Sequence, residues 1–287
     1  MTPPSPIVAA MTPVRVFTDA DELGVALAAE VMEGIRAARR ERRRYLLGCP
    51  GGRSARTTYR ALAELARGED MRHLVIVMMD EYLEPAPDGG FRHVPPDVPH
   101  GCRRFAEQEI RAPIDALAAA PLQDDAVWLP DPADVEAYEP RIVDAGGVDL
   151  FIVASGASDG HVAFMPPGSA LDGGVAIVPL VESTRRDNMA TFPTFRSLDE
   201  VPTHGVSVGL GTIRRVSRAV RLVLVGEGKR TAAARVLGDP GFDPAWPATM
   251  IHTCRDAAIW LDTAAHGGGL EEGPPGGPRG TVTQEVT

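Results

Sequence analysis

The sequence predicts a doubly wound α/β fold, in which helices cover both faces of a mostly parallel sheet. Short apolar runs rich in β-branched residues recur along the chain, as in strands buried on both faces of a sheet, and Val148–Ala154 is an example. Between these runs lie longer segments with apolar residues at helical spacing, such as Leu23, Leu27, Val31 and Ile35. Strands that alternate with helices in this way are typical of a parallel sheet.

The same patterns predict the elements in order. Strands are expected at 14–17, 45–48, 73–79, 126–129, 148–154, 175–180, 205–211, 219–225 and 257–262. Helices are expected at 21–40, 57–67, 102–110, 134–145 and 230–237, and the charged segment 182–195 could lie over a pocket. The stretch 85–99 is rich in glycine and proline and is expected to be a long loop. We expect one domain over residues 13–266, between a disordered N-terminus (1–12) and a disordered tail (267–287).

Composition argues against several classes of function. The chain has 287 residues, enough to bury a large core, and its net charge of −10 argues against binding to nucleic acid. Its three cysteines form no metal-binding pattern, and the N-terminus does not read as a signal peptide. No apolar run approaches the length that spans a membrane. We therefore expect a cytoplasmic protein that binds neither nucleic acid nor membranes.

Reactive side chains follow the strand at 148–154. The strand leads through small residues to Asp159, Gly160 and His161. Ligands bind outside the carboxyl ends of parallel strands, so this is a favourable place for catalysis. Gly160 allows a sharp turn, and an acid beside a histidine can fix its tautomer for proton transfer. In the alternative, Asp159 caps a turn and His161 is a structural histidine, and the tripeptide alone favours that alternative.

Two other segments could bind an anion. Gly51, Gly52, Arg53 and Ser54 lie between a strand and a helix, where free backbone N–H groups can form an anion-binding cradle. An ordinary strand-to-helix turn explains these residues equally well. Lys229 stands at the entrance to the helix at 230–237, which also suits an anion unless the residue is simply solvated.

Two carboxylates, Asp80 and Glu81, follow the strand at 73–79. Carboxylates at the end of a buried strand are costly unless they are solvated or functional. The alternative is that Asp80 caps the entrance to a loop and Glu81 is solvated. The residues alone do not decide between the two.

The order and spacing of these segments resemble the glucosamine-6-phosphate deaminases, also called isomerases, and more distantly the 6-phosphogluconolactonases that share their fold. The resemblance covers most of residues 14–264 and rests on LLGCPGGRSARTTYRAL, VIVMMDEYLEP, VDLFIVASGASDGHVAF, VPTHGVSVGLGTI and LVLVGEGK. It implies the same doubly wound α/β fold and a sugar phosphate as the substrate. The M-D-E-Y form favours the deaminases, because the lactonases usually have an arginine after the D-E pair.

The resemblance also implies roles for individual residues. Asp80 would be the base that moves a proton between C1 and C2 of the open-chain sugar. His161 would assist ring opening, and Asp159 would hold its imidazole. The residues expected to bind the substrate and its phosphate are Gly51, Gly52, Arg53, Ser54, Glu81, Arg185 and Lys229.

The sequence departs from the family pattern in three places, which involve four residues. The deaminases typically read D-G-H-I-A-F-N-E-P, whereas Met165 and Pro166 stand where the asparagine and the catalytic glutamate are expected. Ala190 stands where the lid of the family carries a phosphate-binding arginine, and Arg53 replaces a small hydroxyl residue of the phosphate loop. Arg53, or one of the two arginines in the segment 184–188, could supply the missing guanidinium; in the alternative, the bound anion differs.

Three functions remain open at this point. The first is an isomerase or deaminase that acts on an amino-sugar phosphate, which uses Asp80, Asp159, His161 and Lys229 together. The second is a sugar-lactone hydrolase in which His161 activates water and Asp80 is idle. The third is a non-catalytic sugar-phosphate binder, favoured by the missing glutamate and arginine. We rank the first ahead of the others. No metal and no redox cofactor are implied, and a homo-oligomer is compatible with the sequence.

Overall fold

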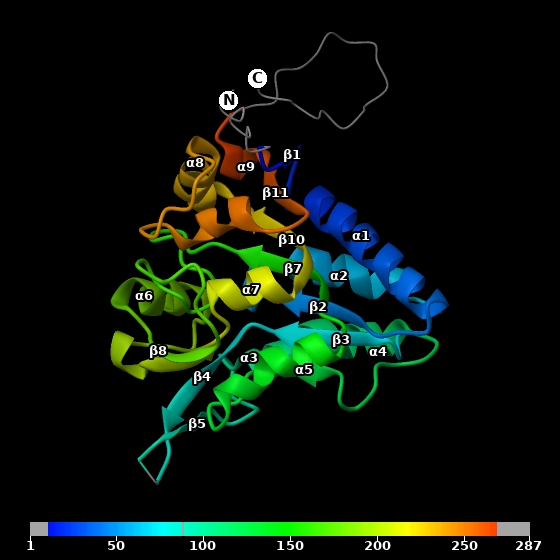
Figure 1. Ribbon diagram of the computed structural model, residues 1–287, viewed down its shortest axis with the longest axis horizontal. Helices are drawn as coiled ribbons and strands as arrows, with labels where there is room; N and C mark the ends of the chain where they lie inside the picture. Colours follow the sequence, from blue (N-terminus) through cyan, green and yellow to red (C-terminus); the bar gives the residue numbers. More distant parts are fainter. Residues whose placement is uncertain (1–10, 88, 269–287) are drawn as a thin grey trace, which may run out of the picture.

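The computed structural model describes residues 11–87 and 89–268. At its centre a seven-stranded sheet runs in the order β1-β11-β10-β7-β2-β3-β6, and all neighbouring strands are parallel (Figure 1). These strands are β1 (Val14–Phe17), β2 (Tyr45–Cys49), β3 (Leu74–Met78), β6 (Val127–Trp128), β7 (Val148–Ala154), β10 (Ser217–Leu224) and β11 (Ala257–Asp262). The predicted mostly parallel sheet is confirmed.

Helices cover both faces of this sheet, as predicted. The connections from β1 through β2 and β3 to β6 cross the sheet in one direction, and those from β6 through β7 and β10 to β11 return in the other. Right-handed crossovers therefore place the two sets of helices on opposite faces. The first set is α1 (Ala20–Arg40), α2 (Arg56–Leu65), α3 (Cys102–Phe105), the π-helical η1 (Ala106–Arg111) and α4 (Ala112–Leu117). The second includes α5 (Tyr138–Asp144), α7 (Leu210–Val216), α8 (Arg230–Gly238) and the 3₁₀ segment η5 (Pro247–Thr253).

A second, antiparallel sheet of four strands was not predicted. Its order is β5-β4-β9-β8, formed by β4 (Asp80–Pro85), β5 (Phe91–His93), β8 (Ala176–Pro179) and β9 (His204–Ser207). The prediction of a long loop at 85–99 is wrong in part, because β5 lies in it and pairs with β4. In Figure 1 this β4–β5 hairpin projects at the lower left, and α6 (Glu182–Thr191) lies near β8.

The strand predicted at 205–211 also ends early. β9 stops at Ser207, and α7 begins at Leu210. The turn between them is set by a close backbone contact, because a Cβ on Gly209 would lie 2.2 Å from the carbonyl oxygen of Gly173. A glycine here lets the chain leave the small sheet and start a helix.

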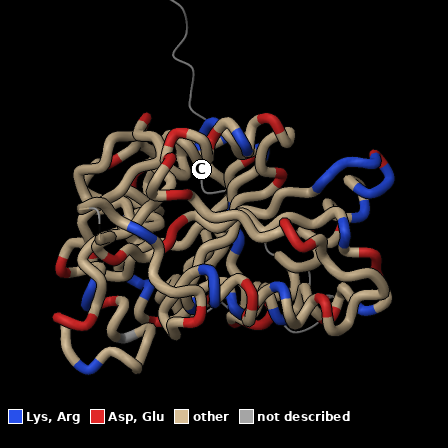
Figure 2. Tube along the Cα trace, turned by 90° about the horizontal axis from the view of Figure 1, so that it is seen from below, with Lys and Arg blue, Asp and Glu red and all other residues tan. Residues whose placement is uncertain are grey.

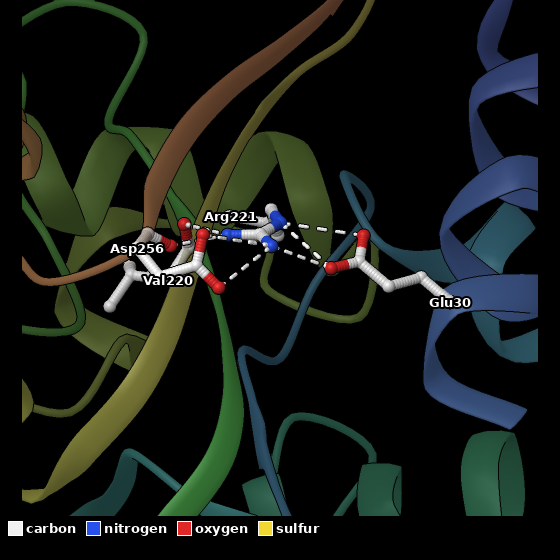
Figure 3. A network of polar contacts seen from close by, with 4 residues as sticks. All are labelled: Glu30, Val220, Arg221 and Asp256. Carbon is white, nitrogen blue, oxygen red and sulfur yellow. Dashed lines mark hydrogen bonds and ion pairs between the residues drawn. The ribbon is translucent and has the colours of Figure 1, made fainter. Parts of the chain in front are cut away.

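A buried arginine ties α1 to the sheet (Figure 3). The Arg221 side chain on β10 is only 10% exposed, and its Nη2 lies 2.6 Å from Oε1 of Glu30 on α1. Its Nη1 donates to the carbonyl oxygens of Val220, at 3.2 Å, and of Asp256 in the turn before β11. These partners compensate for removing the guanidinium from water.

Charged residues are interspersed along the described trace, and the longest basic stretch, residues 39–44, contains Glu41 and lies at the end of α1 (Figure 2). The expectation that the protein does not bind nucleic acid stays a prediction. Within the described ranges, no helix is both long and apolar enough to cross a membrane. The N-terminal and C-terminal segments predicted to be disordered fall almost entirely outside those ranges.

Candidate active site

A cavity of about 530 Å³ opens at the carboxyl ends of the central strands. It lies where β2 pairs with β7. From β2 the chain continues to β3, toward one edge of the sheet, and from β7 it continues to β10, toward the other edge. Such a switch point leaves a crevice between the loops that follow the two strands. Seven of the residues predicted from the sequence line the cavity: Gly51, Gly52, Arg53, Ser54, Asp80, His161 and Lys229.

Asp80 is the first residue of β4, directly after β3, and it is only 6% exposed. Burial raises the pKa of Asp80 to about 7, because a charged carboxylate loses its water there. The thiol of Cys102, which lies 3.2 Å from Oδ1, and the charge of His161 lower this pKa, whereas the charge of Glu81 raises it. The result is a carboxyl group that can gain or lose a proton near neutral pH.

Glu81, predicted to bind the substrate, does not line the cavity. Its carboxylate accepts hydrogen bonds from the backbone N–H groups of Tyr82, Cys102 and Arg103, at 2.9, 2.8 and 2.7 Å. It therefore anchors the first turn of α3 to β4. Burial raises the pKa of Glu81, against the lowering effect of these backbone bonds.

The predicted pairing of Asp159 with His161 is present. Nδ1 of His161 lies 2.7 Å from Oδ1 of Asp159, and the Ser183 hydroxyl of α6 donates to Oδ2 at 2.6 Å. Burial opposes the charged form of Asp159, but the hydrogen bonds from His161 and Ser183 outweigh it and hold the pKa of Asp159 well below its ordinary value. An ionised carboxylate only accepts hydrogen bonds, so Nδ1 carries a proton and Nε2 is the basic nitrogen of the neutral ring.

The turn that presents His161 depends on Gly160. This glycine has a φ of 70°, in the left-handed region, and a Cβ on it would lie 2.5 Å from ring atoms of Trp246. The backbone N–H of Gly156 also donates to the carbonyl oxygen of His161 at 2.7 Å. The loop is thus closed by a backbone hydrogen bond and packed against an indole ring.

Two cationic side chains, Lys229 and Arg53, also line the cavity. Lys229 donates from Nζ to the carbonyl oxygen of Ser155 at 2.5 Å. Burial lowers the pKa of Lys229, and the nearby charge of Arg53 lowers it further, while Asp187 and Asp159 raise it. Lys229 is the only lysine in the sequence. Two cations and the glycine loop, which precedes the N-terminus of α2, can bind an anion here.

The charged segment predicted to lie over the pocket forms α6, and it contributes Asp187 and Asn188 to the cavity wall. Its two arginines face elsewhere. Nη2 of Arg185 donates to the carbonyl oxygens of Leu198 and Val201, and Arg186 pairs with Glu182 on the helix surface. Arg185, predicted to bind the substrate, thus does not line the cavity. Arg53 remains as the guanidinium that does.

One cluster has the composition of a metal site. Asp159, His161 and Asp187 each offer one ligand atom, and these atoms lie within 4.8 Å of one another. The hydrogen bond between Asp159 and His161 already accounts for the closeness of that pair. The arrangement equally suits proton transfer, because it places two carboxylates beside one imidazole.

Several lining residues were not singled out from the sequence. Among them are Tyr82, Cys102, Asp187, Asn188, Thr191, Phe192 and Asp262. Cys102 comes from α3, beyond a long connection, and no sequence pattern connects it to the strand ends. Asp262 ends β11 and accepts the backbone N–H of Gly226 at 2.9 Å, which fixes the loop before Lys229. Asp262 could have been predicted from the sequence, because it is a carboxylate at the end of a predicted strand.

Comparison with known proteins places this site in context. Residues 18–260 match the family described as glucosamine-6-phosphate isomerases/6-phosphogluconolactonase. The chain belongs to this family. A glucosamine-6-phosphate deaminase from Mycolicibacterium smegmatis is 38% identical over 173 residues, 60% of this chain and 64% of that protein. Another from Beutenbergia cavernae is 34% identical over 222 residues, 77% of this chain and 80% of that protein.

Solved structures of the isomerase/lactonase family share the fold. A monomeric glucosamine-6-phosphate deaminase superposes with a TM-score of 0.74 at 23% identity, over 89% of this chain and 99% of its own. The 6-phosphogluconolactonase of Thermotoga maritima gives a TM-score of 0.61 at 19% identity, over 88% and 99%. Both activities occur on this fold, so the site has to distinguish them.

Proposed function

We propose that this protein is an aldose–ketose isomerase or deaminase that acts on an amino-sugar phosphate similar to glucosamine 6-phosphate. The main support is Asp80, a buried carboxyl group with a pKa raised to about 7 that faces the same cavity as His161. A base for proton transfer works best when its pKa is near the operating pH. The names of its relatives from Mycolicibacterium smegmatis and Beutenbergia cavernae agree with this proposal.

In this scheme Asp80 takes the proton from C2 of the open-chain amino aldose, which leaves an enolamine. It then returns the proton to C1, which gives an imine at C2. Water adds to the imine and ammonia leaves, so the products are a ketose phosphate and ammonia. An isomerase would use the same base and the same two carbons. A lactonase needs no proton transfer between carbons, and it would give Asp80 no role.

Ring opening precedes this step and needs an acid–base group near the ring oxygen. His161 is suited to it, because Asp159 holds Nδ1–H and leaves Nε2 to exchange a proton with the sugar. The family's glutamate is replaced by Pro166. We propose that Asp187 provides the second carboxylate, since its oxygen lies within 4.8 Å of the His161 ligand atom.

The substrate phosphate is proposed to bind between Lys229, Arg53 and the backbone of Gly51, Gly52 and Ser54. All five line the cavity. Lysine and arginine side chains form strong charge-assisted hydrogen bonds with phosphate. The arginine at position 53 then compensates for the one that the family carries in its lid.

The cytoplasm is the proposed compartment of the protein. A homo-oligomer is also proposed, and light scattering measures the molar mass that tests for it.

Incubation with glucosamine 6-phosphate in heavy water tests the proposed chemistry. Solvent deuterium should appear on carbon in the product, because Asp80 exchanges its proton with water while it holds it. The incorporation should disappear in Asp80→Asn, while binding of the sugar phosphate survives. Direct analysis of ammonia and ketose by mass spectrometry covers the case in which the proton is transferred without exchange.

The lactonase alternative is tested with the same protein. Hydrolysis of 6-phosphogluconolactone, together with full activity of Asp80→Asn, would contradict the isomerase or deaminase proposal. Binding of sugar phosphates without any product from either substrate would favour a non-catalytic binder. Formation of ketose phosphate that depends on Asp80 supports the proposal over both.

A further inference from the structure

Cys102 is in direct contact with the proposed base. Its Sγ donates to Oδ1 of Asp80 at 3.2 Å, and both side chains are buried. Cys102 lines the cavity beside Asp80, and it is the first residue of α3. Of the three cysteines, Cys49 points its thiol at the carbonyl oxygen of Leu47 instead.

The position of this thiol is fixed by the residue next to Asp80. Glu81 accepts the backbone N–H groups of Cys102 and Arg103, at 2.8 and 2.7 Å. Successive side chains of a strand point to opposite sides, so Asp80 faces the cavity while Glu81 reaches to the helix. One carboxylate thus holds the backbone of the residue whose side chain contacts the other carboxylate.

The thiol stays a donor at neutral pH. Burial, and then the charges of Asp80 and Glu81, raise the pKa of Cys102 well above its ordinary value. A protonated thiol has one hydrogen to donate, and the hydrogen bond at 3.2 Å goes to Oδ1 of Asp80, while Glu81 also interacts with the thiol. One oxygen of the carboxylate is therefore occupied, and the other is left for a substrate.

We propose that Cys102 is a positioning residue for the proton transfer, holding Oδ1 of Asp80 so that Oδ2 is presented to the substrate carbon. The inference rests on the proposed function, because it assigns Asp80 as the base. It adds a residue that no motif of the sequence indicates. A hydrogen bond to the charged form of a carboxylate also favours that form, so the thiol keeps the base active to lower pH.

Other groups also act on Asp80 and have to be kept constant in a test. The charged or titratable groups that interact with it are Tyr59 of α2, Glu81 and Tyr82 of β4, Tyr138 of α5, and His161 of the loop after β7. A substitution at position 102 leaves these five side chains in place, but Glu81 and Tyr82 also interact with Cys102. A shift in the pH profile that appears in Cys102→Ala and not in Cys102→Ser is therefore assigned to the lost hydrogen-bond donor.

The first experiment measures the pH dependence of kcat with glucosamine 6-phosphate. Cys102→Ala should move the midpoint of the acidic limb upward by about one pH unit, which lowers kcat at pH 7 roughly fivefold and changes KM little. Cys102→Ser keeps a donor and should restore the midpoint. Cys254→Ala is the control, because Cys254 donates to the carbonyl oxygen of Met250 and does not line the cavity. An unchanged profile in Cys102→Ala, or an equal shift in Cys102→Ser, would refute the inference.

The second experiment needs neither substrate nor activity. The infrared S–H stretching band of Cys102 is isolated as the difference between the wild type and Cys102→Ser. It should move as the pH passes through about 7, where Asp80 ionises, and it should stop responding in Asp80→Asn. A band that ignores pH in the wild type would overturn the contact. If the band responds but no sugar phosphate is converted, the proposed function fails while the contact stands.

Discussion

Asp80→Asn should stabilise the fold at alkaline pH although it removes the proposed base. The pKa of Asp80 is about 7 in the folded protein, against 3.8 for an ordinary aspartate, mainly because the side chain is buried. The folded state therefore holds the proton more tightly than the unfolded state does. The contribution of protonated Asp80 to the free energy of unfolding is fully present below about pH 4, and it is lost as the pH rises to about 7. An asparagine is neutral throughout and escapes this loss.

The size of the effect follows from the shift. About three pKa units correspond to about 4 kcal/mol in total, at roughly 1.36 kcal/mol for each unit. Of this loss in the free energy of unfolding, about 2–3 kcal/mol falls between pH 5 and pH 8. The free energy of unfolding of Asp80→Asn, relative to the wild type, should rise by that amount over this interval. The amide oxygen of the asparagine can still accept the thiol of Cys102, so little else is lost.

Urea unfolding followed by circular dichroism at the two pH values measures this difference. Asp144→Asn is a matched control, because Asp144 is an exposed aspartate on α5. Its difference from the wild type should stay the same at both pH values. If Asp80→Asn behaves like this control, Asp80 ionises as an ordinary carboxylate, and the argument that burial tunes it for catalysis is wrong.

Three other substitutions have defined outcomes. Lys229→Met should weaken binding of inorganic phosphate, measured by calorimetry, by roughly 10- to 100-fold, whereas Arg230→Met, which removes the neighbouring exposed charge, should not. Asp159→Asn should lower kcat by about 100-fold or more with little change in KM, because the histidine loses its ionised partner. Gly160→Ala should lower the free energy of unfolding by about 2 kcal/mol or more in thermal melts, because its φ is 70° and the added Cβ would meet an indole.

Each of these outcomes can fail separately. Equal losses of phosphate affinity in Lys229→Met and Arg230→Met would show that only net charge matters and that no built anion site exists. A kcat of Asp159→Asn close to that of the wild type would show that the pairing with the histidine is structural. Wild-type stability of Gly160→Ala would mean that the loop can move away from the indole ring.

The parallel sheet could be predicted because each of its strands is identified by its own residues. A strand buried on both faces is an uninterrupted apolar run, and Val148–Ala154 and Ala257–Asp262 were predicted with their observed bounds. The antiparallel sheet could not be predicted in this way. Strand β4 begins with two carboxylates and β5 has three residues, and both are held by pairing with distant segments. Local sequence does not encode that pairing.

The candidate site was predictable where a side chain follows a strand of the parallel sheet. Asp80, His161 and Lys229 come after β3, β7 and β10, whose carboxyl ends lie together. Glu81 could have been set apart from Asp80, because neighbours in an extended chain face opposite sides and only one of them can reach the cavity. Cys102 had no such signal, since it depends on how α3 docks after a long connection.

The substitutions that separate this chain from the family pattern also need the structure to be understood. Pro166 and Ala190 remove a carboxylate and a guanidinium from their expected positions. The cavity nevertheless contains both kinds of group, because Asp187 reaches it from α6 and Arg53 from the loop after β2. Both charges act on Lys229, where Asp187 raises the pKa and Arg53 lowers it. A comparison of motifs position by position shows only that the glutamate and the arginine are missing. It does not find Asp187 and Arg53, because these side chains come from other positions in the sequence. The cavity wall is therefore a better basis for assigning chemistry to this chain than the motif is.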